Sequence, residues 1–449
     1  MSTTKVQEKQ LAQAEIKAKA RTHFADSLHA VLEAEQRVSE MLGIARSEPE
    51  KYLEKVWSSN AETPAGLSSL PVTRFRAPGL QSAFAQANGM AKSGRRVAIF
   101  GSQLDASAER LPSTCAPYVA HRLAEERGPE STALLFELLA RTPEQACHFA
   151  FIARRLAELA LVPGILHSAQ SYQQAAFKPV QSLTNDQIKS FLGDPADKIP
   201  TPTAAQQQFF GASRRRLPEM LAEEDVPDTA LFWRDLLPLF VDTLTAFQQL
   251  TGIAYQPIEA LQTDDADIVL VATGSHFDYL QENKQKLEAK AKIKIGLLHP
   301  TLLRPFPGGL ITQHLKQKKA CLVLSHANDT QSKSLLRKVR LAIDKAFANG
   351  LAEKQNLGTA PYPNYPVYQN LTDRPQLFSA CAEELTVQDL GELLQQIANG
   401  KSKPQHDLFL SGNSKSTPAA SLEESPKSAL HLAMQTELAH QKGKIIAES

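Results

Sequence analysis

Residues 267–275 read Asp-Ile-Val-Leu-Val-Ala-Thr-Gly-Ser, and this stretch decides the fold. An apolar run that closes on a Gly-Ser pair is typical of a parallel strand that is buried on both faces and leads into a helix. A charged segment of helical length follows at 277–290, and further apolar runs occur at 293–298 and 321–324. Strands and helices that alternate over short connections predict a doubly wound α/β domain with a parallel sheet.

A second set of alternating segments precedes this one. The run 95–102 reads as a strand that ends at a glycine, and 133–139 is another strand candidate, although its Leu and Ala content leaves a helix open. Thr142-Pro143-Glu144-Gln145 combines an N-cap Thr, a Pro at the first helical position and a Gln three residues after the cap, so it predicts a helix up to the next strand at 162–167. The chain is therefore predicted to hold two doubly wound parallel-sheet α/β domains.

The domain boundaries follow from composition. Residues 1–60 are rich in Ala, Glu, Lys and Gln and predict a helical N-terminal arm. We place the first α/β domain at 71–230, where it ends in a long irregular connection, and the second at 231–400. Residues 401–449 are rich in Ser, Lys, Pro and Gln, which predicts a flexible, disordered tail. The apolar positions that suggest the arm's amphipathic helix are Ala30, Leu32, Val38, Met41, Leu42 and Ile44.

Charge and composition limit the classes of function. Lys and Arg number 49 and Asp and Glu 48, so a net charge of +1 gives no general attraction to nucleic acid. No apolar run reaches the roughly 18 residues that span a bilayer, so we predict no membrane segment and a cytoplasmic protein. The isolated cysteines Cys115, Cys147, Cys321 and Cys381 show neither zinc-site nor iron–sulfur spacing, so no metal site is predicted.

No common nucleotide, hydrolase or zinc motif is present, but a longer series of segments carries a family resemblance. From about Thr73 to Asn399 the chain resembles the first two domains of pyruvate:ferredoxin (flavodoxin) oxidoreductases. The resemblance implies a thiamine-pyrimidine-domain-like first domain and a transketolase-C-terminal-like second domain. The matching segments are Val72–Phe75, Gly94–Ala98, Ala108–Pro112, Val119–Ala124, Thr142–Ala146, Val162–His167, Gln181–Gln187, Phe247–Gly252, Ala266–Val269 with Thr273–Ser275, and Leu302–Phe306.

The departures from the family decide the expected function. In that family a Glu after the Thr-x-Phe strand hydrogen-bonds the aminopyrimidine of thiamine diphosphate, whereas here Phe75 is followed by Arg76 and Ala77. A Gly-Asp-Gly motif for the magnesium diphosphate is also missing, since Gly193-Asp194 is followed by Pro195. We therefore expect no bound cofactor and a non-catalytic structural or partner-binding component of a redox assembly. Degenerate modules of this type also resemble the N-terminus of fungal NADPH-sulfite reductase components.

Two alternatives remain open. The first is an active subunit of a 2-oxoacid:ferredoxin or flavodoxin oxidoreductase, working with a separate thiamine diphosphate-binding chain. The resemblance places a substrate-binding Arg near Arg122, so Arg122 and, after it, His121 are candidate substrate or anion ligands. The second alternative is a small-molecule sensor that uses the cleft between the two α/β units. His167 ends a predicted strand and is expected to be a half-buried histidine with its hydrogen bonds satisfied.

Partner binding is expected at a loop that combines tyrosines with prolines. Tyr362, Tyr365 and Tyr368 alternate with prolines that prevent a regular strand or helix, so we expect their rings at the surface. Exposed aromatic rings on a rigid backbone are typical of interface hot spots. We also expect a homodimer, because the relatives bury α/β faces against a second copy, and a redox protein as a further partner.

Overall fold

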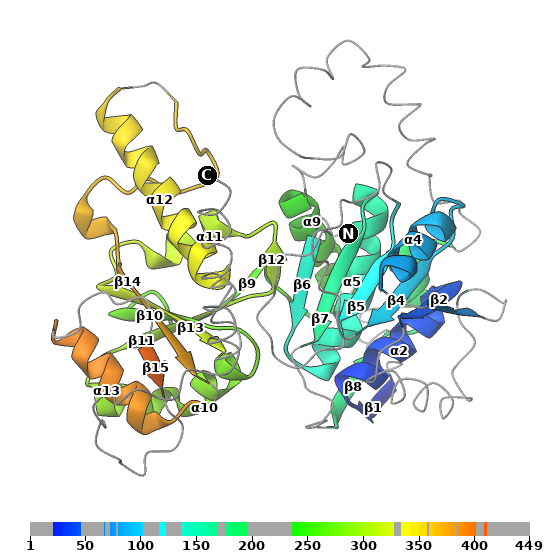
Figure 1. Cartoon of the computed structure of the whole chain (residues 1–449), viewed down its shortest axis with the longest axis horizontal. Coiled ribbons are helices and arrows are strands. Elements are labelled where there is room, and N and C mark those ends of the chain that lie inside the picture. The colour runs from blue at the N-terminus through cyan, green and yellow to red at the C-terminus, as the bar shows by residue number, and fades with distance from the viewer. Residues whose placement is uncertain are drawn as a thin grey trace, which may run out of the picture. The chain divides into compact units, whose positions relative to one another are not determined.

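The computed structural model describes residues 21–45, 67, 72–77, 80–101, 116–122, 136–168, 177–194, 236–326, 334–356, 359–382, 384–400 and 408–410. They form a seven-stranded sheet, a six-stranded sheet and a two-stranded ribbon, with helices around both larger sheets (Figure 1). Within this described part of the chain, no helix is both long and apolar enough to cross a membrane.

The seven-stranded sheet has the order β12-β6-β7-β5-β4-β2-β3. All of its strands run parallel except β12, which is antiparallel to β6. The strands are β2 (Met41–Ala45), β3 (Thr73–Ala77), β4 (Val97–Gly101), β5 (Val119–Arg122), β6 (Phe136–Ala140), β7 (Gly164–Ser168) and β12 (Leu302–Arg304). A separate antiparallel ribbon joins β1 (Arg21–Ala25) to β8 (Lys178–Ser182).

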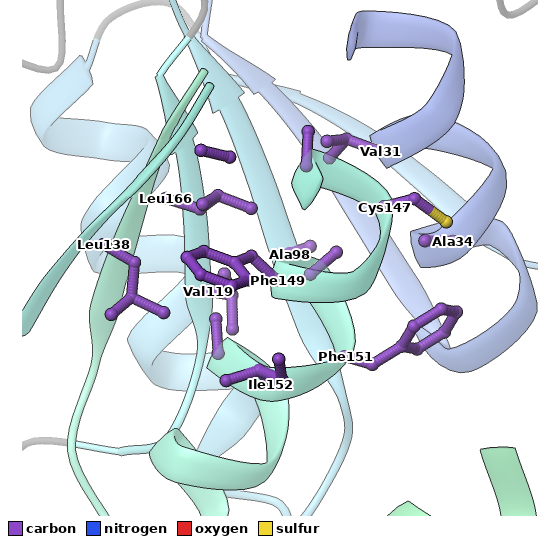
Figure 2. Packing of buried hydrophobic residues seen from close by; sticks show 14 of the residues in the cluster. Val31, Ala34, Ala98, Val119, Leu138, Cys147, Phe149, Phe151, Ile152 and Leu166 are labelled. Atoms are coloured by element: carbon purple, nitrogen blue, oxygen red, sulfur yellow. The ribbon is translucent and has the colours of Figure 1, made fainter. Parts of the chain in front are cut away.

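Helices cover both faces of the seven-stranded sheet. Successive residues of a strand point to opposite faces, so Ala98 packs into one core with α2 and α5, whereas Val97 and Ile99 pack into another with α4. Figure 2 shows Phe149 of α5 against Val119. The helices of this part are α2 (Ser27–Val38), α4 (Leu80–Ala91), α5 (Pro143–Ala160), α6 (Asn185–Leu192) and α9 (Leu236–Thr251).

The six-stranded sheet has the order β15-β14-β13-β10-β11-β9, and only β9 is antiparallel to its neighbour. Its strands are β9 (Ile258–Leu261), β10 (Ile268–Val271), β11 (Ile295–Pro300), β13 (Ala320–His326), β14 (Gln376–Ala382) and β15 (Leu408–Leu410). Helices α10 (Gly274–Ala291) and α13 (Val387–Ala398) pack on one face, and α11 (Gly308–Leu315) and α12 (Ser334–Lys354) on the other. A short 3₁₀ helix, η4 (Leu371–Asp373), precedes β14.

The local predictions that rest on capping and apolar runs are confirmed. Thr142 accepts a hydrogen bond from the Gln145 amide at 3.1 Å, and α5 starts at Pro143 as the cap predicts. The strand candidate at 133–139 forms β6, and the run at 267–275 forms β10 and the start of α10. The fold class, two doubly wound α/β domains, is therefore confirmed.

The predicted N-terminal arm is wrong within the described residues. The helix is present as α2, but Met41, Leu42 and Ile44 lie in β2, which is inside the sheet between β3 and β4. The helix ends at Ser39, where the backbone becomes extended (φ −83°, ψ 139°), and the amide and hydroxyl of Ser39 both bond back to Glu35. The residues beyond Ser39 are apolar, as expected for a strand whose two faces are both covered by helices. Residues 1–20 and 46–60 of the arm lie outside the described part.

The predicted boundary at 231 also needs correction. A boundary at 231 would place α9 in the second domain, yet Leu236, Phe240 and Phe247 of α9 belong to the first core, where they pack with α5. The second domain therefore starts after α9, at about β9. One of the later strands, β12, pairs with β6 and so belongs to the first sheet. Within the predicted flexible tail, Leu408–Leu410 pairs with β14 as β15, and the other residues of 401–449 lie outside the described part.

Candidate functional site

Arg122 and His167 lie side by side at the carboxyl ends of β5 and β7. They are register partners in neighbouring parallel strands, so their side chains leave the same face of the sheet. Both are buried, with 4% and 6% of their surface exposed. Ligands of doubly wound folds bind at this edge, outside the carboxyl ends of the strands. The structure therefore places the predicted residue Arg122 where a ligand would be expected.

His167 is a neutral imidazole in this position. Burial lowers its pKa well below the ordinary value, and the positive charges of Arg122 and Lys338 lower it further. Its Nε2 is 3.8 Å from Oε2 of Glu137, which is too long for a hydrogen bond, and it has no hydrogen-bond partner among the described residues. The prediction of a satisfied half-buried histidine is therefore wrong. A neutral imidazole between cations can donate one hydrogen bond to an anion.

Lys338 brings the second domain to this edge. It lies in α12, its charge acts on His167, and its Nζ donates a hydrogen bond to the backbone oxygen of Leu303 at 3.0 Å. The site thus combines two cations from two domains with a neutral histidine and the nearby carboxylate of Glu137.

His121 points to the opposite face of the sheet, where it is bound by other side chains of the first domain. Its Nε2 donates to Oε1 of Glu35 at 2.7 Å, and its ring stacks on Phe100 at 4.8 Å. Oε2 of Glu35 accepts from Ser39 at 2.5 Å and from Arg154 at 3.0 Å, and both Glu35 and Arg154 are fully buried. The assignment of His121 as an anion ligand is therefore corrected, because an internal carboxylate occupies its donor.

Burial alone would raise the pKa of Glu35, but its partners outweigh burial. The charge of Arg154, the hydrogen bond and charge of His121 and the hydrogen bond of Ser39 together bring the pKa from 4.5 to about 2. Glu35 is thus a fixed carboxylate anion whose two oxygens are both occupied. It ties α2 to β5 and α5 rather than offering a catalytic group.

The tyrosine loop is only partly a surface. Tyr362 is 38% exposed, Tyr365 is half-buried, and Tyr368 is buried with its hydroxyl donating to the backbone oxygen of Thr312 at 2.6 Å. The surface assignment of Tyr368 is therefore wrong, because this ring fills the core between α11 and α12. Nζ of Lys345 lies 5.3 Å from the centre of each of the other two rings.

The loop is held in place by one side chain. Asn349 donates Nδ2 to the backbone oxygens of Tyr362 at 2.8 Å and Tyr365 at 3.0 Å, and it accepts from the Tyr362 amide at 2.9 Å. Asn349 itself is 1% exposed. The exposed edge of Tyr362 and Tyr365 with Lys345 is therefore a rigid aromatic and cationic surface.

A second edge of the same type lies in the six-stranded sheet. The chain leaves β10 for β11 on one side and returns to β13 on the other, so the switch point of the topology falls between β10 and β13. Here Gly274 opens α10 with a φ of 58°, and the rings of His276 and His326 stack at 5.5 Å. In the described part of the chain, no group of three or more His, Cys, Asp or Glu side chains could hold a metal ion.

The pyrimidine-side residues do not fit thiamine diphosphate. β3 ends at Arg76 and Ala77, Arg76 is exposed, and the sequence holds no Asp or Glu between Glu62 and Asp105. The buried carboxylate of Glu35 is occupied by its own donors. The chain therefore lacks a carboxylate where the resemblance would require one.

Comparison with known proteins agrees with the family resemblance that the sequence segments carry. Residues 266–355 match the family model described as pyruvate:ferredoxin oxidoreductase core domain II. The pyruvate synthase subunit PorA of Thermotoga maritima is 23% identical over 203 residues, which cover 42% of this chain and 48% of PorA. The match thus spans about half the length of that curated relative.

Two solved structures are similar in fold. One is the 2-oxoglutarate:ferredoxin oxidoreductase of Magnetococcus marinus, with a TM-score of 0.49 and 12% identity over 84% of this chain and 65% of that chain. The other is a split-gene transketolase in an inactive β4 tetramer, with a TM-score of 0.44 and 12% identity over 83% of this chain and 96% of that chain. The domain model and PorA confirm the family resemblance: the chain is pyruvate:ferredoxin oxidoreductase-like, and its residues 266–355 match core domain II of that family.

Proposed function

We propose that the chain is a non-catalytic, pyruvate:ferredoxin oxidoreductase-like component that serves as a structural or partner-binding part of a redox assembly. The end of β3 carries this proposal. The resemblance calls for a carboxylate there, and the chain offers the exposed cation of Arg76 instead. A guanidinium repels the protonated aminopyrimidine that the missing carboxylate would stabilise.

The buried network around Glu35 supports the same proposal. Its carboxylate is the fully buried acid of α2, and its oxygens accept from His121, Ser39 and Arg154. To bind a cofactor, the Glu35 carboxylate would have to give up its hydrogen bonds to these three donors. The positive charge of Arg154 would then be buried in the core without a partner carboxylate. Uncompensated buried charges of this kind are strongly destabilising. The network therefore fits a structural role.

The partner surface that we propose is the edge formed by Tyr362, Tyr365 and Lys345. Its backbone is fixed by Asn349, so little ordering entropy is lost when a partner covers it. We propose a homodimer and a redox protein as the partners. The likeness to fungal NADPH-sulfite reductase components stays a prediction.

Calorimetric titration of the full chain with thiamine diphosphate and Mg²⁺ tests the proposal directly. We expect no heat of binding, and an affinity in the micromolar range would overturn it. A pyruvate:ferredoxin oxidoreductase with its own cofactor removed serves as the positive control. The partner surface is tested separately in a homodimer assay by light scattering, with Tyr362→Ser and Tyr365→Ser against the matched control Phe177→Ser, since Phe177 is 56% exposed elsewhere.

The arrangement of Arg122, His167 and Lys338 favours a second candidate function. In an active subunit, these groups would hold the carboxylate of a 2-oxoacid while another chain supplied the cofactor. In a sensor, the same groups would bind the anion without chemistry. Titration with pyruvate and with 2-oxoglutarate, in the absence of cofactor, should then give binding that Arg122→Gln abolishes and Arg374→Gln, in a distant ion pair, retains. Turnover on addition of a cofactor-binding chain would separate the subunit from the sensor.

A further inference from the structure

Arg141 connects the two α/β domains through its side chain. It follows β6 directly and precedes Thr142, the N-cap of α5, so its backbone belongs to the first domain. Its Nε and Nη2 donate to Oε2 of Glu259 in β9, at 3.1 and 2.8 Å, and its Nη1 donates to Asp278 in α10. One guanidinium thus binds two carboxylates of the second domain.

The surroundings of Arg141 show that this contact is built into the fold. Gln145 of α5 donates to the other oxygen of Glu259 at 2.8 Å, and its own oxygen accepts from the Arg141 amide at 2.8 Å. The guanidinium lies 4.9 Å from the centre of the Phe277 ring. The side chains of Arg141 and Glu259 are 15% and 26% exposed, so the pair is partly shielded from water. Planar, charge-assisted pairs of this type are the stronger ones.

In the described part of the chain, backbone hydrogen bonds also join the two domains at the short strand β12. β12 pairs with β6, and the Leu139 amide donates to the Thr301 oxygen at 2.8 Å. β12 has three residues and a register irregularity between Leu302 and Arg304, so it offers few hydrogen bonds. Both of its ends continue into the second domain, as β11 and α11. Such a strand can stay paired with β6 while α12 turns away and the hydrogen bond from Lys338 to the Leu303 oxygen breaks.

We propose that Arg141 is a latch that holds the second domain closed on the first, and that β12 is the pivot about which the second domain turns when the latch opens. In the closed state, Nζ of Lys338 in α12 donates to the Leu303 oxygen at 3.0 Å, and its charge acts on His167. In the open state, that edge loses one of its two cations. Because the latch is an ion pair at partial exposure, added salt weakens it.

Distances between two spin labels in the full chain test the latch. Leu159→Cys in α5 and Leu351→Cys in α12 supply the labels, since both side chains are 46% exposed, and the chain without these substitutions gives the label background. We expect Arg141→Gln to shift the ratio of closed to open molecules by about tenfold or more, as the loss of charge-assisted hydrogen bonds implies. High salt should shift the original chain in the same direction and change Arg141→Gln little.

Arg374→Gln is the matched control, because Arg374 also pairs with a carboxylate, Asp344 at 2.7 Å, and also lies over a ring, Phe347 at 5.8 Å, but within one domain. It should leave the distances unchanged. An unchanged distribution in Arg141→Gln, or an equal change in both variants, would overturn the latch.

The second domain offers an independent approach if Arg141→Gln fails to fold. The double variant Glu259→Gln with Asp278→Asn removes the two negative charges that face Arg141 and substitutes no residue of the first domain. It should lengthen the label distances as Arg141→Gln does, with the same dependence on salt. If this double variant folds and keeps the original distribution, the latch is refuted whatever Arg141→Gln does.

Discussion

Oε1 of Glu35 and Nε2 of His121 form a 2.7 Å hydrogen bond in the core, between residues that are 86 positions apart in the sequence. Arg154 completes the charge balance from α5, and its other amino group donates to the Val97 oxygen at 2.9 Å. Three elements, α2, β5 and α5, are thereby fixed by one buried polar network. This network explains why the segment before Ser39 is part of the first domain and not an arm.

Arg154→Met should lower the free energy of unfolding by about 3–5 kcal/mol, because it leaves the carboxylate of Glu35 buried without its cation. Urea denaturation followed by circular dichroism measures this loss. Arg155→Met is the matched control, since Arg155 is the next residue of α5 but is only half-buried. The double variant Arg154→Met with Glu35→Gln should recover part of the loss, and equal losses in all three variants would contradict the network.

Glu35 should give the fold a dependence on pH in the acid range. Its pKa in the folded chain is about 2, below the ordinary value of 4.5, so folding favours the charged form. The contribution is complete above pH 4.5 and is lost as the pH falls towards 2, to a total of roughly 3 kcal/mol. Unfolding free energies measured between pH 2 and 5 should show this slope in the original chain. A slope of the same size in Glu35→Gln would assign it to other groups.

His299 should make the stability of the fold depend on pH in a higher range than Glu35 does. Burial lowers its pKa from 6.5 to about 4, Glu259 opposes this shift and Arg141 adds to it. The folded chain thus favours the neutral imidazole, and stability present above pH 6.5 is lost as the pH falls through 4, by up to roughly 3 kcal/mol. His299→Gln should flatten the stability profile between pH 4 and 6.5. Thermal melting across that interval checks the change, and an undiminished slope would count against His299.

Tyr368→Phe should destabilise the second domain by about 1–3 kcal/mol, because the buried backbone oxygen of Thr312 loses its 2.6 Å donor. Tyr362→Phe, on the exposed part of the same loop, should change the melting temperature little. Differential scanning calorimetry of the two variants distinguishes core from surface. Equal effects would show that the hydroxyl of Tyr368 contributes nothing.

Gly164→Ala should strain the first sheet. A Cβ at this position would lie 1.9 Å from the ring of Phe136 in the neighbouring strand, so the ring must move. A destabilisation of about 1–3 kcal/mol is expected from such overpacking, and Phe136→Leu in the same chain should relieve part of it. Gly89→Ala is the control, because nothing lies within 4 Å of its added Cβ and alanine favours a helix. Chemical denaturation measures the free energy of unfolding of these variants and of the original chain. Gly164→Ala should be the least stable, its combination with Phe136→Leu should be more stable, and Gly89→Ala should be at least as stable as the original chain.

The sequence predicts those parts of the fold whose signals are local. The cap at Thr142 and the apolar run before Gly274 specify α5 and β10 without help from distant residues. Leu42 could not be placed in the same way, because its apolar spacing fits a helix and only the pairing with β3 and β4 makes it a strand. β12 likewise owes its domain to β6, more than 150 residues earlier in the sequence, and α9 owes its domain to α5, more than 70 residues earlier.

Of the residues at the edge formed by Arg122, His167 and Lys338, the sequence predicts a ligand-binding role for Arg122. Arg122 came from the order of the family's segments, whereas Lys338 is one of several basic residues in α12 and carries no signal of its own. Glu35 would be taken for the polar side of an amphipathic helix, since its partner His121 is far away in the sequence. Tyr368 was misplaced because the prolines around it exclude regular structure but do not exclude burial.

The return of β12 to the first sheet has a consequence for how the protein is made. Among the described strands, the outer neighbour of β6 is β12, so while the ribosome synthesises the chain this edge of the first sheet lacks β12 until residue 304 has emerged. Open strand edges recruit other chains, and N-terminal domains usually fold before their successors. Here the first domain must finish after the second has begun, and a gene fragment that stops between β9 and β12 would encode an aggregation-prone product.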